Sequence, residues 1–113
     1  RFPVFSRNDV NYDLCFYLAN WPNKRIAAWD TLLKARAIEN QSYVIGLNRV
    51  GIDGYKADYS GHSQVIDPQG DIIASAPENE IGLVELILSK NHLLEIRKRL
   101  PFLNDRDELE LSI

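Results

Sequence analysis

The chain has 113 residues, 45% hydrophobic and 26% charged, which suits one globular domain and excludes a disordered segment. Thirteen basic against sixteen acidic residues give a formal net charge of −3, which argues against nucleic acid or an anionic membrane as the main partner. No apolar run approaches the roughly 18 residues of a transmembrane helix, no signal peptide opens the chain, and a single cysteine excludes an intrachain disulfide. We therefore expect a cytoplasmic protein.

The chain begins at Arg1 and contains no methionine. A natural reading frame opens with methionine, so we expect residues 1–113 to be a single-domain fragment of a longer protein.

The first half of the chain predicts a strand, a helix and a second strand. Leu14–Leu18 and Tyr43–Leu47 are apolar runs of strand length, typical of strands that are buried on both faces. Between them we predict a helix over about Lys24–Gln41, with Asn23 as its N-cap. Apolar residues at helical spacing give this helix one broad buried face: Ile26, Trp29, Leu32, Leu33, Ala35, Ala37 and Ile38. A crossover helix between two buried strands predicts parallel pairing in an α/β fold.

Antiparallel strands are predicted next, which makes the fold α+β by strand pairing. Ser63–Ile66 and Asp71–Ala74 flank Asp67–Gly70, whose Pro and Gly suit a type I turn. Ile81–Ile87 predicts a third strand of this group.

The C-terminal part predicts a short capped helix and an acidic tail. Ser89 is placed to cap a helix over about Lys90–Arg99, with Pro101 ending it. Its inward residues are expected to be Leu93, Leu94 and Ile96. The tail at residues 104–113 alternates acidic and apolar residues, and we expect it to act as an arm on a partner subunit.

Few residues have the spacing of a catalytic or metal site. His62 and His92 do not lie at ligand spacing to each other or to Cys15, so we predict no metal and no cofactor. We expect a structural hydrogen bond for His62 and an exposed position for His92. Gly51–Gly54 matches no phosphate-binding loop and predicts a hairpin turn. Cys15 lies in an apolar run, where a buried thiol is inert, so we predict a core cysteine and not a nucleophile.

Arg36 and Glu39 lie three residues apart near the end of the predicted helix, so their side chains can meet. Spacing alone favours a solvated pair over a semi-buried pair that fixes the helix beneath a site.

Several motifs, in order along the chain, resemble the C-terminal half of a carbon–nitrogen hydrolase of the nitrilase superfamily, nearest to the bacterial omega-amidase type. They are Arg1–Asn8, Tyr17–Pro22, Leu33–Val44, Asn48–Gly51, and Tyr59–Ser63 with Asp67–Gly70. The resemblance implies half of an α-β-β-α sandwich and packing of subunits into a homodimer or a larger homo-oligomer. One departure from the family is Ala28, where many relatives carry His.

The resemblance also implies hydrolysis of a small-molecule amide by a Cys nucleophile, a Glu base and a Lys. In the family, the nucleophile would lie four residues before Arg1, and the Glu and Lys lie further upstream. We therefore expect no catalytic residue in this chain and no activity from the fragment alone. Cys15 does not occupy the nucleophile's place.

The resemblance leaves substrate-binding residues within the chain. Arg1 matches the position four residues after the nucleophile, where a guanidinium suits a bidentate contact with a substrate carboxylate. Arg25 is a second carboxylate candidate, and an exposed first-turn position explains it equally well. Asn20 and Trp21 follow the end of a strand, where α/β folds place sites. For Trp21, a pocket wall and a core position are equally supported.

Arg36 and Glu39 match a motif of the family, which favours the semi-buried reading of this pair as structural support for the site. The implied reaction is that of an omega-amidase, for example 2-oxoglutaramate to 2-oxoglutarate and ammonia. Another branch of the superfamily, an N-carbamoyl-amine hydrolase or an aliphatic amidase, remains an alternative. So does a non-catalytic association module.

Overall fold

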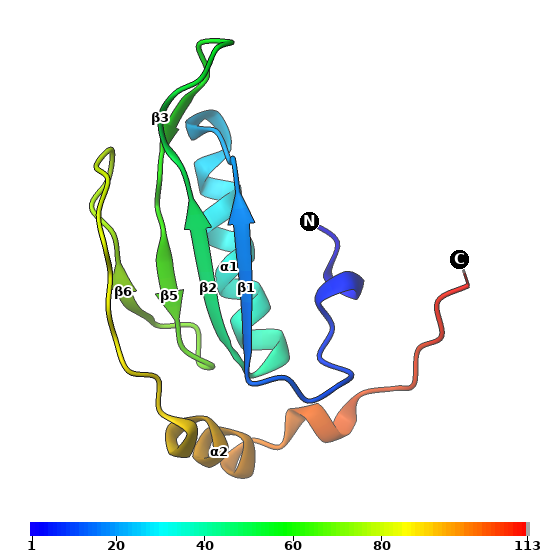
Figure 1. The fold of residues 1–113 in the computed structure, drawn as a ribbon. Coiled ribbons are helices and arrows are strands. Elements are labelled where there is room, and N and C mark those ends of the chain that lie inside the picture. The colour runs from blue at the N-terminus through cyan, green and yellow to red at the C-terminus, as the bar shows by residue number, and fades with distance from the viewer. Residues whose placement is uncertain (113) are drawn as a thin grey trace.

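The computed structural model describes residues 1–112. In chain order its elements are η1 (Pro3–Ser6), β1 (Leu14–Ala19), η2 (Asn23–Arg25), α1 (Ile26–Asn40), β2 (Tyr43–Asn48), β3 (Val50–Ile52), β4 (Asp58–Ser60), β5 (Gln64–Ile66), β6 (Ile72–Ser75), α2 (Lys90–Arg99) and η3 (Phe102–Asp105). Figure 1 shows α1 lying against one face of the main sheet, with α2 below the strands. This is the mixed α/β architecture that the sequence predicts.

The main sheet has four strands in the order β1-β2-β5-β6. β1 and β2 run parallel, with Leu14 opposite Tyr43 and Ala19 opposite Asn48, which confirms the predicted crossover through α1. β2 pairs antiparallel with β5, and β5 with β6. The turn between β5 and β6 closes as predicted: the Gly70 N–H donates to the Asp67 carbonyl at 2.9 Å, and Gly70 has a φ of +94° that favours glycine.

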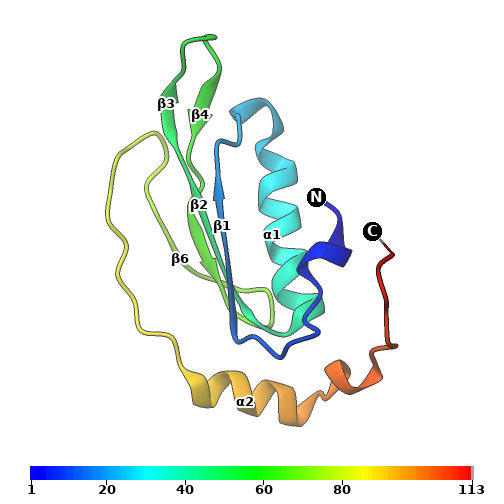
Figure 2. The ribbon, with the colours of Figure 1, turned by 45° about the vertical axis from the view of Figure 1, so that its right-hand side comes forward.

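A second hairpin, β3–β4, extends beyond the main sheet (Figure 2). The Asp53 carboxylate organises its turn, because Oδ1 accepts the N–H groups of Tyr55 at 2.8 Å and Ala57 at 2.9 Å. The turn predicted at Gly51–Gly54 is therefore confirmed, although Gly51 itself belongs to β3.

The core lies between α1 and the main sheet. Trp29, Leu33 and Ala37 of α1 are buried against Val44 and Ile66. Gly46 makes this close approach possible, because a Cβ atom there would lie 2.4 Å from Leu33 Cδ1 and 2.8 Å from Trp29 Cζ2. Trp29, Leu33 and Ala37 confirm the predicted stripe, but Ile38 is 50% exposed and does not widen it.

β1 differs from the strand that its apolar sequence predicts. Leu14, Phe16 and Leu18 are 39%, 62% and 71% exposed, and the alternate residues on the face toward α1 are half-buried. Leu47, also exposed, lies opposite Leu18 on the neighbouring strand. We call these four residues the apolar sheet face. The prediction of burial on both faces was wrong for β1 because no layer of the described chain covers this side.

The start of α1 also differs from its prediction. Asn23 is not the N-cap, because a separate turn of 3-10 helix, η2, precedes the α-helix, which begins at Ile26. The Asn23 side chain instead accepts a hydrogen bond from the Ser60 hydroxyl at 2.9 Å. A contact with β4 therefore competes with the capping role that the local sequence favours.

Two expectations for the later part of the chain need correction. Ile81–Ile87 is not a strand: Ile81 and Ile87 are 95% and 97% exposed, and the segment borders a hollow of about 730 Å³ beside β2 and β5. Ser89 caps α2 as predicted, since its hydroxyl accepts the His92 N–H at 3.1 Å. Leu94, however, is 49% exposed and does not point inward.

The C-terminal tail runs extended beside the N-terminal segment, where the Arg7 guanidinium donates to the carbonyl of Asp107. Leu109 and Leu111 are about half exposed, and Ile113 lies outside the described residues. Contact of this tail with a partner subunit stays a prediction. Among the helices that the structure describes, none has the length and apolarity to span a bilayer.

Candidate functional site

Two segments meet at the carboxyl ends of the parallel strands β1 and β2. Asn48 ends β2, and its side chain holds the backbone of Trp21, which follows β1. Oδ1 accepts the Trp21 N–H at 2.7 Å, and Nδ2 donates to the carbonyls of Trp21 at 2.9 Å and Gly61 at 2.8 Å. This edge of a parallel pair is where α/β folds bind ligands. Asn48 thus fixes three chain segments at a candidate site.

Trp21 is half-buried between the core and solvent. Its ring centroid lies 5.8 Å from that of Trp29, at a tilt of 39°. The Arg25 guanidinium carbon lies 5.7 Å from the Trp21 ring centroid, and the Arg25 carbonyl accepts the Trp21 ring N–H at 2.6 Å. Trp21, Arg25 and Asn48 form what we call the strand-end cluster. The Trp21 ring therefore packs against the core and also contacts the exposed guanidinium of Arg25.

Asn20 lies exposed at the end of β1 and makes no side-chain hydrogen bond within residues 1–112. The structure thus brings Trp21 and Arg25 together and leaves Asn20 beside them. The substrate-binding roles of Asn20, Trp21 and Arg25 stay predictions.

Arg36 anchors the start of the chain to α1. Its side chain is only 7% exposed, with Nη1 donating to Glu39 Oε1 at 2.8 Å and Nη2 donating to the Arg1 carbonyl at 2.6 Å. Glu39 is 41% exposed, so the pair is semi-buried and the solvated alternative is wrong. The N-terminal segment covers the Arg36 side chain and buries it. The spacing of residues along the helix does not predict this contact. Whether this pair supports a site stays a prediction.

Arg1 is held away from the strand-end cluster. Its carbonyl contacts Arg36, and Arg36 lies eleven positions after Arg25, about 16 Å along the helix axis at 1.5 Å per residue. The exposed Arg1 side chain makes no hydrogen bond or ion pair within the described part of the chain. The structure therefore does not join Arg1 to Trp21 or Arg25.

Buried polar residues reinforce this anchoring of the N-terminal segment. Asn8 is fully buried, and its N–H donates to Asn40 Oδ1 at 2.9 Å. The Tyr17 hydroxyl donates to Ser6 Oγ at 2.6 Å, and the Tyr12 hydroxyl donates to the Ser6 carbonyl. Burial raises the pKa of Tyr12 to about 12 and also raises the pKa of Tyr17, so both phenols keep their protons for these bonds.

Cys15 is half-buried on the face of β1 that looks toward α1, together with Tyr17. Among the described residues, no carboxylate or lysine hydrogen-bonds its thiol, as an activated nucleophile requires. The sequence predicts a core position, and the structure places the thiol at the margin of the core.

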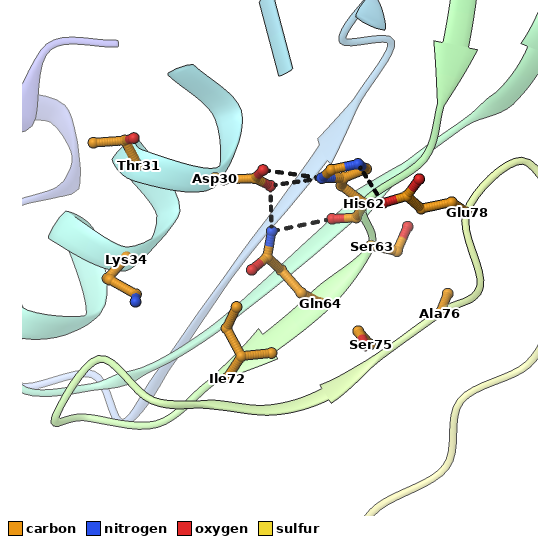
Figure 3. A pocket seen from close by; sticks show the side chains of 10 residues that line it. All are labelled: Asp30, Thr31, Lys34, His62, Ser63, Gln64, Ile72, Ser75, Ala76 and Glu78. Atoms are coloured by element: carbon orange, nitrogen blue, oxygen red, sulfur yellow. Dashed lines mark hydrogen bonds and ion pairs between the residues drawn. The ribbon is translucent and has the colours of Figure 1, made fainter. Parts of the chain in front are cut away.

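The two histidines both contact carboxylates. His62 Nδ1 lies 2.9 Å from Asp30 Oδ2, and Nε2 lies 3.1 Å from Glu78 Oε1 (Figure 3), which confirms the expected structural hydrogen bond. His92 Nε2 lies 3.1 Å from Asp67 Oδ2, with a side chain 41% exposed. His92 was expected to be exposed, and the structure leaves it only partly exposed, because α2 passes close to the β5–β6 turn that carries Asp67.

Sequence reasoning missed the role of Asn48. The signal for it was available, because a polar residue directly after an apolar strand, beside a second parallel strand, lies at the ligand-binding edge. Asn8 and Asn40 gave no comparable signal, since their contact joins residues 32 positions apart. Within the described residues, no group of three or more His, Cys, Asp or Glu side chains is placed to hold a metal ion.

Comparison with known proteins defines the class of protein to which this chain belongs. The model of the carbon-nitrogen hydrolase family matches residues 9–97. The chain belongs to this family.

The relatives within the family include amidases. The chain is 51% identical over 111 residues to the omega-amidase YafV of Escherichia coli K12, covering 98% of this chain and 43% of that protein. It is 46% identical over 88 residues to the 2-oxoglutaramate amidase of Paenarthrobacter nicotinovorans, covering 78% of this chain and 29% of that protein.

A solved structure shares the fold. The CN-hydrolase superfamily protein XC1258 of Xanthomonas campestris, which carries an arsenic adduct in its active site, superposes with a TM-score of 0.94 at 42% identity. The match covers 98% of this chain and 44% of XC1258. The chain spans less than half the length of each of these three proteins, as expected for half of a nitrilase-superfamily fold.

Proposed function

We propose that the protein containing this chain is an omega-amidase-like hydrolase that converts a dicarboxylate amide such as 2-oxoglutaramate to 2-oxoglutarate and ammonia. The observation that carries this proposal is the 51% identity to the omega-amidase YafV over 98% of the chain. The 2-oxoglutaramate amidase at 46% identity points to the same substrate class.

We place the catalytic Cys, Glu and Lys before Arg1. The Glu takes the thiol proton, and the thiolate sulfur bonds to the carboxamide carbon. The Lys ammonium stabilises the resulting oxyanion. The C–N bond then breaks, nitrogen takes a proton and ammonia leaves. Water cleaves the thioester, which releases the carboxylic acid and restores the thiol. On this proposal the present chain alone is inactive.

The chain's own part is to bind and position the substrate. Either Arg1 or Arg25 offers a guanidinium group to its carboxylate, and Asn20 and Trp21 line the approach at the ends of the parallel strands. The Arg36–Glu39 pair supports this wall by holding the Arg1 backbone in place. The substrate and reaction need no cofactor.

We further propose a homodimer or larger assembly. The exposed leucines of the tail supply apolar surface that a monomer leaves in water. The cytoplasmic location stays a prediction from the sequence.

Ammonia release tests the activity. The longest natural chain that contains this sequence is assayed with 2-oxoglutaramate, a simple aliphatic amide and an N-carbamoyl amine. We expect the highest kcat/KM with 2-oxoglutaramate. Preference for either of the other substrates assigns the protein to another branch of the superfamily, and turnover of none of them supports a non-catalytic module.

A further inference from the structure

A pocket of about 460 Å³ opens between α1 and the β5–β6 hairpin (Figure 3). This volume lies within the range of small-molecule sites. Asp30, Thr31 and Lys34 border it from α1, Gln64 from β5, and Glu78 from the segment after β6.

Gln64 carries a buried acceptor that no described residue satisfies. The residue is 6% exposed, and its side-chain Nε2 donates to Asp30 Oδ1 at 2.8 Å and to the His62 carbonyl at 3.2 Å. Both partners are acceptors when Asp30 is ionised, so the amide cannot be turned the other way. Oε1 therefore faces away from them toward the pocket (Figure 3), buried and without a hydrogen-bond partner within residues 1–112. A buried acceptor in this state favours a bound donor.

Charge is divided across the pocket. The carboxylates of Asp30 and Glu78 contact the two ring nitrogens of His62, and Asp30 also accepts a hydrogen bond from Gln64. Lys34 lies one helical turn beyond Asp30 on α1 and is exposed, with its ammonium at the other side of the opening (Figure 3). One end of the pocket thus presents acceptors and negative charge, and the other presents a cation.

We propose that this pocket binds a small zwitterion of the α-amino acid class. The ammonium group of the ligand donates to Gln64 Oε1 beside the Asp30 carboxylate, and its carboxylate pairs with the Lys34 ammonium. A simple amine leaves Lys34 without a partner. A simple anion brings negative charge toward Asp30 and Glu78, and leaves Gln64 Oε1 without a donor. This inference does not depend on the proposed amidase activity.

Binding is tested by NMR titration of the longest natural chain that contains this sequence. L-Alanine and L-glutamine are the zwitterionic probes, with ethylamine and propionate as analogues that carry one charge each. We expect saturable shifts of the Gln64 side-chain amide with both amino acids. The affinity for ethylamine and propionate should be at least about tenfold lower, because each loses one charged contact.

Two lysine variants distinguish this pocket from general charge effects. Lys34→Met should weaken L-alanine binding about fivefold or more, whereas Lys24→Met, an exposed lysine before α1 and outside the pocket, should leave it unchanged. Both positions are exposed, so the fold should persist, which a thermal melt by circular dichroism checks. Absence of saturable shifts, equal binding of ethylamine and L-alanine, or equal losses in the two variants each overturn the proposal.

Discussion

The Asn48 side chain forms two hydrogen bonds with the backbone of Trp21: it accepts the Trp21 N–H at 2.7 Å and donates to the Trp21 carbonyl at 2.9 Å. The same amide donates to the Gly61 carbonyl at 2.8 Å. One side chain therefore joins the end of β1, the end of β2 and the loop before β5. The position of the Trp21 ring depends on these three bonds.

Asn48→Ala should lower the free energy of unfolding by about 2–4 kcal/mol, since it removes three hydrogen bonds and leaves part-buried backbone groups unpaired. Urea unfolding measures the change. Asn20→Ala is the matched control, because Asn20 is exposed and its side chain has no partner among residues 1–112, so a change within about 0.5 kcal/mol is expected. Equal losses in the two variants contradict the assigned role of Asn48.

Arg36→Met should release the start of the chain. The variant loses the bond to the Arg1 carbonyl and the pair with Glu39, and we expect a loss of about 1–3 kcal/mol in stability and faster hydrogen exchange in residues 2–6. Glu39→Gln should cost about 1 kcal/mol or less, because Glu39 is 41% exposed and solvent screens the pair. Unchanged exchange in Arg36→Met means that Asn8 and the tyrosines alone hold the segment.

Asp13 gives an acid-dependent contribution to stability. A hydrogen bond from Lys90, followed by the charges of Lys90 and Arg97, holds the pKa of Asp13 below its ordinary value of 3.8. Because the folded-state pKa is lowered, the stabilisation is complete above the unfolded pKa and is lost as pH falls through the folded pKa. We expect Asp13→Asn to be less stable than the parent at pH 6. The difference should shrink below about pH 4. A difference that does not change with pH contradicts this account.

Kinetics with two different amide substrates distinguish the roles of Arg1 and Arg25. On the proposed function, Arg1→Ala in the full-length protein should lower kcat/KM for 2-oxoglutaramate, with a loss of about 2–4 kcal/mol of transition-state binding, because a charge-assisted bidentate contact is lost. A simple aliphatic amide has no distal carboxylate and should be affected far less. Arg25→Ala, measured in parallel, shows which guanidinium binds the carboxylate. Equal losses on both amides indicate that Arg1 instead supports the loop of the nucleophile.

Local sequence patterns were sufficient to predict much of the fold. The apolar spacing of Trp29, Leu33 and Ala37 predicts the buried face of α1, Ser89 predicts the start of α2, and the Pro and Gly of Asp67–Gly70 predict the β5–β6 turn. These features depend on contacts within a few residues, or on a periodicity that burial of one face requires.

Long-range contacts account for what the sequence did not reveal. The spacing of Arg36 and Glu39 predicts their pair, but the burial of Arg36 depends on Arg1, 35 positions away. Apolar residues at Ile81–Ile87 allow a strand, but a strand also needs a pairing partner, and this segment pairs with none of the described strands. Likewise, the apolar sequence of β1 shows that both of its faces can be buried, but it does not show which layer of the protein covers each face.

The apolar sheet face should drive association. β1 is an edge strand, and Phe16 and Leu18 on it are 62% and 71% exposed, so both its free edge and its outer face are open to a partner. Sedimentation equilibrium of the 113-residue chain at micromolar concentration should show a dimer or larger species. Leu18→Lys should weaken association, because it places a charge on this apolar face. Tyr55→Lys, on a residue 96% exposed in the β3–β4 hairpin and away from this face, is the control and should not. A monomer of 12.9 kDa with cooperative unfolding contradicts the prediction, since it means that this surface is stable in water.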